Sequence, residues 1–292
     1  MQQPLISIIT VNYNQAALTV EFIRSIQASD YSNFEIIVVD NCSPEDASWI
    51  QDSFPNIIYI AAPENGGFAY GNNLGIEKAK GEYLFFINND TTITKNCLSL
   101  LLNFCQQKSN VGAVSPRIVY ADTPSKVQFS GGYLNPFTSQ IVWQNQQKSE
   151  QEHQTFECET DIVHGAAMFV PAKVIKDIGG MPEEYFLLYE EFDWSLTIRK
   201  AGYKLYYFGT PIVYHKVSQS IKNSPFKAFY MARNRLLFIR RHFIGVQKFS
   251  SFLFVTLITV PKSILKHSLL KEWAQVKAIL KGVLWHLNHI IL

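Results

Sequence analysis

The sequence predicts an α/β protein: a mixed, mainly parallel sheet flanked by helices and followed by an amphipathic helical C-terminal extension. Two observations predict the sheet. Short runs rich in Ile, Val and Phe recur along the first half of the chain, and segments of helical length separate them. This alternation is typical of βαβ units, whose parallel strands are covered on both faces. A third observation, the distribution of charge, separates the C-terminal region from the rest.

The expected elements follow in chain order. Strands are expected at the runs LISIITV, FEIIVVD, IIYIAA, EYLFFIN and VGAVS, which are residues 5–11, 34–40, 57–62, 82–88 and 111–115. Helices are expected at residues 15–28, 68–80 and 95–107. The polar residues 116–160 leave short antiparallel strands and a long excursion both open. After them we expect a strand at 161–171, a helix at 190–202 and edge strands at 204–215.

Composition bounds the class of protein. Of the 292 residues, 47% are hydrophobic and 17% are charged, which excludes a disordered chain. The four cysteines form no CxxC pair and no metal-finger spacing, so we interpret them as free thiols in a reducing compartment. Asn12 and Asn14 interrupt the apolar run near the N-terminus, so no signal peptide is expected and a cytoplasmic location is predicted.

Charge divides the chain into an acidic body and a basic tail. From Lys222 onward there are 12 Lys/Arg and one acid, Glu272, a net charge of +11, whereas the first 221 residues carry 14 Lys/Arg and 23 acids, a net charge of −9. The tail reads as amphipathic helices with two tryptophans, Trp273 and Trp285. Its apolar run at 252–260 is shorter than the roughly 20 residues of a membrane-spanning helix.

This tail is interpreted as a peripheral anchor on an anionic membrane surface. The alternative is a helical lid packed on the domain. Nucleic acid would attract the same charge, but no recognised binding motif accompanies it, so no nucleic acid partner is expected.

Polar side chains end four successive strands. They are Thr10 to Asn12, Asp40 and Asn41, Glu64 to Gly67, and Asn88 to Asp90. Ligands bind at the carboxyl ends of strands in open α/β sheets, so these groups are expected to converge on one rim, although each alone would also suit a cap or a turn. Asp90 offers a hard oxygen ligand for Mg²⁺ or Mn²⁺, which would need substrate phosphates to complete its shell. No Walker or GxGxxG loop is present.

The motifs ITVNYN, VVDNCS, ENGGFAYGNNLG, FINND, HGAAMFV, IGGMPEEYFLLYEEFDWSLTIRKAGY and YHK occur in the order found in one family. Over residues 5 to about 240 the chain resembles the family 2 inverting glycosyltransferases with the GT-A fold, and most resembles their bacterial rhamnosyltransferase-type members. The resemblance implies a nucleotide-diphosphate sugar donor, dTDP- or UDP-linked, and a Mg²⁺ or Mn²⁺ cofactor. The implied donor-site residues are Thr10 and Asn12 beside the nucleotide, Asp40 at the base, Gly67 and Asn73 around the pocket, and Asn88 and Asn89 at the rim.

The resemblance also assigns the metal ligands and the catalytic base. Asp90 would be the ligand from the family's Asp-x-Asp motif, whose first acid is replaced here by Asn88, and His215 would close on the diphosphate or the metal. Inverting transfer needs a carboxylate to take the acceptor's proton. Glu191 takes that position, with Asp193 as the catalytic alternative and Glu190 in support; the helix dipole would equally explain one or two of these acids as caps.

Three further residues are expected on the acceptor side. His164 and Gly165 lie within the expected strand at 161–171, with a structural histidine as the alternative for His164 and likewise for His215. Trp194 would stack on an acceptor sugar or belong to the core.

We therefore expect a catalytic domain at 1–219, with a donor half at 1–115 and an acceptor half at 116–219, and a membrane-associating region at 220–292. The expected function is transfer of a sugar, rhamnose being one candidate, to a saccharide acceptor. We expect a lipid-linked acceptor, used in cell-surface polysaccharide synthesis at the inner face of the plasma membrane. One alternative is a sugar nucleotidyltransferase, although VNYNQAAL lacks that class's glycine-rich basic loop. Another is an inactive membrane-attached saccharide-binding module, although Asp90 and Glu191 are both present.

Overall fold

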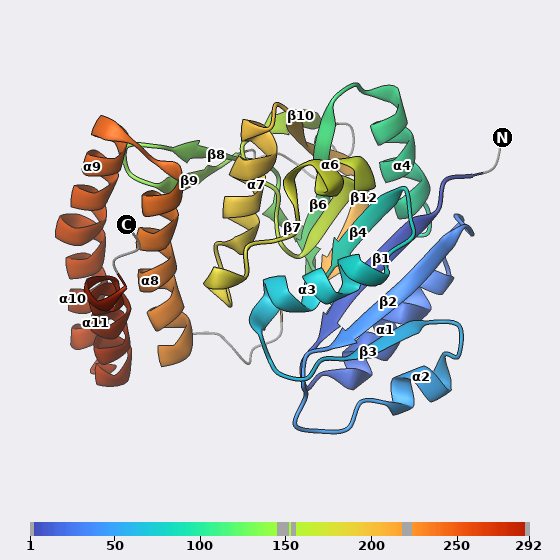
Figure 1. Cartoon of the computed structure of the whole chain (residues 1–292), viewed down its shortest axis with the longest axis horizontal. Helices are drawn as coiled ribbons and strands as arrows, with labels where there is room; N and C mark the ends of the chain where they lie inside the picture. Colours follow the sequence, from blue (N-terminus) through green and yellow to red (C-terminus); the bar gives the residue numbers. More distant parts are fainter. Residues whose placement is uncertain (1–2, 145–151, 153–155, 218–223, 290–292) are drawn as a thin grey trace. The chain divides into compact units, whose positions relative to one another are not determined.

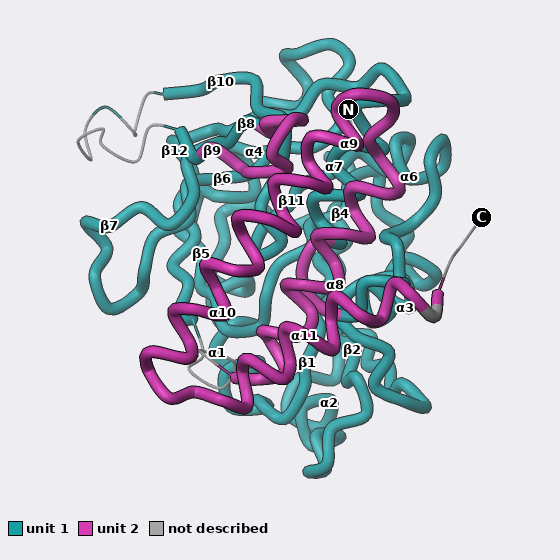
Figure 2. Tube along the Cα trace, turned by 90° about the vertical axis from the view of Figure 1, so that its left-hand side faces the viewer, with its two compact units in different colours: residues 1–133, 143–186, 190–217 teal, residues 134–142, 187–189, 218–292 magenta. Residues whose placement is uncertain are grey.

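The computed structural model describes residues 3–144, 152, 156–217 and 224–289 (Figure 1). The chain forms two compact units, coloured separately in Figure 2. Unit 1 comprises residues 1–133, 143–186 and 190–217, and unit 2 comprises residues 134–142, 187–189 and 218–292. The expected boundary between residues 219 and 220 lies outside the described residues, and the division into halves at residue 115 stays a prediction.

Among the described residues, one mixed sheet dominates unit 1. Its strands are β1 (Ile6–Asn12), β2 (Phe34–Asp40), β3 (Ile58–Ala61), β4 (Tyr83–Ile87), β5 (Thr91–Ile93), β6 (Val111–Tyr120), β7 (Thr123–Phe129), β10 (Glu157–Thr160), β11 (Ala167–Pro171) and β12 (Lys204–His215). Their order is β10-β12-β6-β11-β4-β1-β2-β3, with β5 paired to β12 and β7 to β6. Strands β8 (Gly132–Asn135) and β9 (Gln140–Trp143) form a separate pair.

The sheet confirms the predicted α/β class. β1 to β4 lie side by side in parallel, and β12 runs parallel to β6. The polar stretch contributes antiparallel strands: β7 pairs with β6 and β10 with β12. Short antiparallel strands are therefore the correct alternative for the described part of 116–160.

Two expected strands need correction. β12 is a single strand placed inside the sheet between β10 and β6, and is no edge strand. Most of its side chains are buried, and a neighbouring strand lies along each of its two edges. The strand expected at 161–171 begins only at Ala167, since residues 162–166 form the turn that carries His164 and Gly165.

Helices cover both faces of the sheet. They are α1 (Ala16–Gln27), α2 (Trp49–Ser53), α3 (Gly67–Lys78), α4 (Cys97–Gln107), α6 (Ala172–Ile178), the 3-10 turn η1 (Glu183–Tyr185) and α7 (Glu190–Lys200). Residues from α3, α6 and α7 share one buried cluster with Ile9, Phe86 and Leu205 of the sheet. Phe104 of α4 stacks on Phe208 in β12 (4.6 Å between ring centroids), on the face opposite Leu205. α1 lies behind the sheet in Figure 1.

Unit 2 is mainly helical. It contains α8 (Pro225–His242), α9 (Gly245–Phe254), the π-helical turn η3 (Val255–Thr259), α10 (Val260–Leu269) and α11 (Trp273–Asn288). α9, η3 and α10 form one continuous 25-residue helix, 245–269. By length and composition it is the one helix in the described part of the chain that could cross a membrane, and 11% of its most apolar 18-residue window is buried. The nine-residue run at 252–260 therefore understates its apolar length.

Candidate functional site

Three of the predicted strand-end residues form one hydrogen-bonded network. The side-chain amide of Asn12, at the end of β1, donates to the Asp40 carboxylate at the end of β2 (2.6 Å). The Asn89 amide donates to Thr19 of α1 (3.0 Å) and to the Asn12 side-chain oxygen (3.3 Å). All four side chains are buried. The rim predicted from the strand ends exists, because parallel strands β1, β2 and β4 deliver their polar ends to the same edge.

Ser43 completes this network, and the sequence interpretation missed it. Its backbone N–H and hydroxyl both donate to Asp40, which fixes that carboxylate at the edge of the sheet. The VVDNCS motif held the signal, since a serine three residues after an Asp can close an Asx turn. Thr10 lies in the same strand as Asn12 but is fully buried, and its role beside a nucleotide stays a prediction.

Gly67 begins α3 in a conformation that suits glycine alone. Its φ is +90°, and an added Cβ would lie 2.0 Å from the Phe186 carbonyl oxygen. The Phe68 N–H donates to the same oxygen (2.8 Å). Further along α3, the Asn73 amide donates to the Met181 carbonyl (2.9 Å) and accepts from the Met181 N–H (2.8 Å). Both residues therefore join α3 to the segment that leads towards α7.

Asp90 and His215 form the centre of the candidate metal site. The Nε2 atom of His215, the last residue of β12, lies 3.1 Å from Oδ1 of Asp90. β5, directly after Asp90, pairs with the end of β12, and the Lys216 N–H donates to the Asp90 carbonyl (2.9 Å). Both side chains are 8% exposed. Residues 125 positions apart in the sequence are therefore brought together by the β5–β12 pairing.

Gln128 of β7 sets the orientation of the His215 ring. Its side-chain oxygen lies 2.8 Å from Nδ1 of His215, so Nδ1–H donates to it and Nε2 is directed at Asp90. An imidazole fixed in this way through its second nitrogen is the usual arrangement of a metal-binding histidine. Sequence reasoning could not find Gln128, because the polar stretch carrying it shows no motif.

The Asp90–His215 pair fits one edge of a metal coordination shell. Two neighbouring ligands of an octahedral ion with bonds of about 2.1 Å lie about 3 Å apart, close to the observed 3.1 Å. The described residues contain no group of three or more His, Cys, Asp or Glu side chains arranged to hold a metal ion. Two protein ligands alone suit Mg²⁺ or Mn²⁺, which complete their shells with water and substrate phosphates.

Glu191 lies at the same edge of the sheet. A Cβ added at Gly165 would sit 3.7 Å from the Glu191 carboxyl carbon, so the two residues are neighbours. The next residue, Ala166, accepts a hydrogen bond from the Asn88 N–H (3.1 Å), two positions before Asp90. The chain therefore connects the Glu191 side chain to the end of β4 through the short 162–166 turn.

Ser195 fixes α7 against that turn. Its hydroxyl donates to the Glu191 carbonyl (2.6 Å) and accepts from the Val163 N–H (3.1 Å). Because Ser195 is fully buried, the first turn of α7 has a defined position beside Gly165.

The other two acids of the YEEFDW motif are more enclosed than Glu191. Asp193 is 1% exposed and its carboxylate accepts from the Tyr185 hydroxyl (2.7 Å), while Glu190 is also buried. Glu191 is half-buried. This geometry favours Glu191 over Asp193 for contact with an acceptor.

The expectation that Trp194 stacks on an acceptor sugar is corrected in favour of the core alternative. Its indole is 1% exposed and packs edge-on against Phe86, with ring centroids 5.4 Å apart. A ring enclosed on this scale has no face available to a sugar.

His164 occupies an aromatic environment near the metal-site residues. Its ring lies 5.5 Å from that of Phe129, and its Nδ1 accepts from the Ala166 N–H (3.1 Å). Desolvation, with a smaller contribution from His215, lowers the pKa of His164 to about 3. His164 is therefore neutral at physiological pH.

A strained loop precedes α7. Leu188 and Tyr189 have φ values of +70° and +80°, which side chains of this size rarely adopt. Within unit 2, the fully buried Asn234 of α8 donates to the Leu187 carbonyl (2.8 Å) and the Leu188 carbonyl (2.7 Å). Asn234 is thus a third residue, after Ser43 and Gln128, that sequence reasoning missed.

Comparison with known proteins identifies the family to which the sequence is similar. The family described as "Glycosyl transferase family 2" matches residues 7–179. Glycosyltransferase GlyG of Streptococcus pneumoniae is 35% identical over 36% of this chain and 36% of its own length. The low-salt glycan biosynthesis hexosyltransferase Agl10 of Haloferax volcanii is 27% identical over 80% of this chain and 74% of its own. This chain therefore spans about a third of GlyG.

A solved structure shares the fold. The mannosyltransferase PcManGT from Pyrobaculum calidifontis, in complex with GDP-Man and Mn²⁺, superposes with a TM-score of 0.58 at 15% identity. The match covers 98% of this chain and 87% of that one. At this identity the likeness concerns the fold alone, a mixed α/β GT-A architecture.

Proposed function

Because the chain belongs to glycosyl transferase family 2, we propose that it is an inverting enzyme acting on a nucleotide-diphosphate sugar, dTDP- or UDP-linked. The acceptor is a saccharide in cell-surface polysaccharide synthesis, and the transferred sugar is a hexose or rhamnose. The observation that carries the proposal is the placement of the Asp90–His215 pair and Glu191 at one edge of the sheet. Ligands for a cation that would bind the diphosphate, and a base for the acceptor hydroxyl, are both available there.

The chemistry assigns one step to the chain's own carboxylate. Glu191 takes the proton of the acceptor hydroxyl as its oxygen attacks the anomeric carbon. The bond from that carbon to the diphosphate oxygen breaks, and its electron pair leaves with the nucleotide diphosphate. Attack on the face opposite the leaving group inverts the anomeric configuration.

Asp90 and His215 would hold a divalent cation, Mg²⁺ or Mn²⁺, which when bound neutralises charge on the departing diphosphate. Asn12 and Ser43 hold Asp40 at the rim, where it would accept from a nucleobase N–H. Gly67 would shape the donor pocket indirectly, because its missing Cβ lets the Phe186 carbonyl pack against the start of α3.

Thermal shift with a panel of donors tests this function. The protein with Mn²⁺ should be stabilised by one class of dTDP-, UDP- or GDP-sugar, and by the matching nucleotide diphosphate, more than by ATP. A panel without any stabilising donor would reject the donor site. A donor that is bound but never transferred or hydrolysed would favour the saccharide-binding alternative. Pyrophosphate-dependent formation of a nucleoside triphosphate would indicate a sugar nucleotidyltransferase.

We also propose that unit 2 binds the surface of an anionic membrane, which would bring the enzyme to a lipid-linked acceptor at the inner face of the plasma membrane. Large apolar side chains are exposed along the helix of residues 245–269; they include Phe249 (66%), Leu257 (68%), Leu265 (61%) and Leu269 (75%). Such exposure on a basic segment suits an interface where apolar groups enter the acyl region and lysines meet lipid phosphates.

The two tryptophans of this region differ. Trp273 is 58% exposed and is available to a membrane interface. Trp285 instead packs against the buried Arg233 guanidinium, 4.3 Å from its ring centroid, and stabilises the bundle.

Vesicle sedimentation tests the membrane proposal. The full chain should bind vesicles containing phosphatidylglycerol more strongly than vesicles of phosphatidylcholine alone, and the double variant Phe249→Ser/Leu257→Ser should bind weakly. Trp49→Ser, which removes an exposed aromatic side chain from unit 1, is the matched control. Unchanged binding by the double variant would reject this surface as the anchor.

A further inference from the structure

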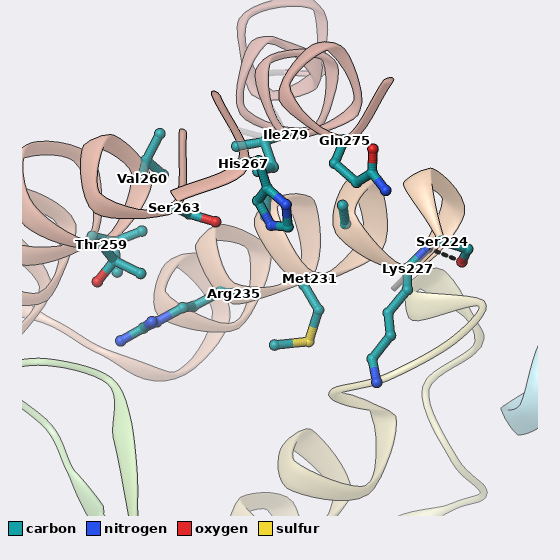
Figure 3. Close-up of a pocket in the computed structure, with 13 residues that line it drawn as sticks. Ser224, Lys227, Met231, Arg235, Thr259, Val260, Ser263, His267, Gln275 and Ile279 are labelled. Atoms are coloured by element: carbon teal, nitrogen blue, oxygen red, sulfur yellow. Dashed lines mark hydrogen bonds between the residues drawn. The ribbon is translucent and has the colours of Figure 1, made fainter. Parts of the chain in front are cut away.

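The helices of unit 2 enclose a cavity of about 250 Å³, outside the candidate site. Figure 3 shows Lys227, Met231 and Arg235 of α8 on one wall, with His267 of α10 extending towards them from the other. α11 contributes Gln275 and Ile279. All lining residues belong to unit 2.

The lining combines an apolar interior with cations. Met231, Val255, Val260 and Ile279 supply the apolar part, and Lys227, Arg235 and His267 supply the basic part. No acid is among the lining residues. Glu272, the single acid of the tail, pairs with the outer side of His267: its carboxylate lies 2.6 Å from Nδ1. Lys227 and Arg235 are therefore the permanently charged lining residues, and both are cationic.

The helix of residues 245–269 carries two different stripes. Val255, Thr259, Ser263 and His267, at intervals of four, face the cavity, whereas Leu253, Leu257, Leu265 and Leu269 are exposed. A stripe packed into an ordinary helical bundle would be apolar. Here the lining includes Thr259 and Ser263, and neither hydroxyl has a hydrogen-bond partner among the described residues. These polar groups suit a ligand better than a core.

The backbone is also irregular at this wall. The π-helical turn Val255–Thr259 begins and ends on lining residues. Pro261 follows it and removes one backbone donor from the helix. Single π-helical turns of this kind widen a helix locally and often occur at binding sites.

We infer that this cavity binds one anionic phospholipid, with the phosphate at Lys227, the hydroxyls of Thr259 and Ser263 further along the cavity as additional polar contacts, and the start of an acyl chain along Met231, Val255 and Ile279. Its volume lies below the usual 300–1,000 Å³ of small-molecule pockets, so it holds a part of the lipid and not the whole molecule. The exposed apolar stripe on the same helix would receive the remainder of the chains. This inference deepens the membrane association proposed above and rests on it.

Arg235 supports the site without being free for the ligand. Its Nε donates to the Ser139 hydroxyl (2.9 Å) and one terminal nitrogen donates to the Thr138 carbonyl (2.8 Å). Lys227 has no ion-pair partner among the described residues, so its charge is the one assigned to the lipid phosphate.

Titration calorimetry of the full chain tests the inference without vesicles or a donor sugar. The probe is dihexanoyl phosphatidylglycerol, used below its micelle concentration, with dihexanoyl phosphatidylcholine and inorganic phosphate as separate arms. We expect phosphatidylglycerol to bind at least tenfold more tightly than either. Lys227→Ala and Ser263→Trp, which fills the cavity, should each weaken binding about tenfold.

Lys262→Ala is the matched control, because Lys262 is an exposed lysine of α10 that does not line the cavity. Its affinity should stay within twofold of the parent chain. Equal affinity for the two phospholipids would overturn an anionic site, and displacement by millimolar phosphate alone would assign the cavity to a free anion. Equal losses in Lys227→Ala and Lys262→Ala would overturn the assigned position. If circular dichroism shows that Ser263→Trp is unfolded, the comparison of Lys227→Ala with Lys262→Ala alone tests the proposed site.

Discussion

His215 and Asp90 lie 125 positions apart in the sequence, yet their side chains meet at 3.1 Å. The antiparallel pairing of β5 with β12 produces this contact, because Thr91 stands directly opposite His215. Each side chain is 8% exposed, so the pair is largely shielded from bulk solvent.

Removing either member of this pair should weaken divalent-ion binding. Asp90→Asn and His215→Ala are expected to weaken Mn²⁺ affinity by more than about tenfold in the presence of UDP, since each removes one of two protein ligands. Electron paramagnetic resonance of free Mn²⁺ measures this directly. Asn88→Asp, which restores the acid of the family motif, should strengthen binding. Undiminished affinity in Asp90→Asn would place the ion elsewhere.

Gln128→Ala should weaken the same site without removing a ligand. Loss of the acceptor for Nδ1–H frees the His215 ring to rotate, and substitutions of such outer partners weaken metal affinity about 10- to 100-fold. Gln128→Glu keeps the acceptor and should retain binding. The same Mn²⁺ titration reports both, and equal affinities for parent and Gln128→Ala would show that the contact does not orient the ring.

Glu191→Gln should separate chemistry from binding. The amide keeps the size of the side chain but cannot take a proton, so we expect transfer to fall by about 10²- to 10⁴-fold while donor affinity is unchanged. Radiolabelled sugar transfer and thermal shift with the nucleotide diphosphate give the two readouts. Asp193→Asn is the comparison: it perturbs the Tyr185 contact and should lower stability more than Glu191→Gln does. Full activity of Glu191→Gln would reject this residue as the base.

Asn234→Ala should destabilise the loop that leads into α7. The substitution leaves two partly buried carbonyls, those of Leu187 and Leu188, without the amide that now donates to them. We expect a loss of about 2–3 kcal/mol in the free energy of unfolding. Urea denaturation measures it, with Arg241→Ala, an exposed position on the same helix, as the control within about 0.5 kcal/mol. Similar losses of unfolding free energy in Asn234→Ala and Arg241→Ala would contradict the role of Asn234 in stabilising this loop.

The lowered pKa of His164 predicts an acid-sensitive stability. Unfolded chain binds a proton on this histidine below about pH 6.5, whereas folded chain does so only near pH 3. The contribution of His164 to the free energy of unfolding is therefore present at pH 7, and it is lost progressively as the pH falls from 6.5 towards 3.

The matching variant is His164→Gln. Between pH 7 and pH 5 the parent chain should lose about 1 kcal/mol more unfolding free energy than the variant, after allowance for partial solvent exposure. Urea titrations at the two pH values give this difference, and using each protein's own pH 7 value cancels the packing effect of the substitution. Parallel pH dependence would show that His164 protonates in the folded chain.

Local sequence determined much of this protein. The apolar runs of β1 to β4 and the helical spacing of Thr19, Phe22, Ile23 and Ile26 in α1 read directly as parallel strands and an amphipathic helix, because backbone periodicity fixes which side chains are buried. Since parallel strands share one carboxyl edge, Asn12, Asp40 and Asn89 could also be placed together in advance. The net positive charge of the tail followed directly from the numbers of Lys, Arg and acidic residues in it.

Tertiary structure alone decided the remainder. β12 was expected at an edge and lies inside the sheet; Trp194 could have been a sugar platform and is core; Gln128 carried no signal at all. Each depends on which distant strand or helix becomes a neighbour, and that choice follows from packing the whole sheet. The cavity in unit 2 has the same origin: Thr259 and Ser263 look like ordinary residues of an apolar helix until α8 and α11 close around them.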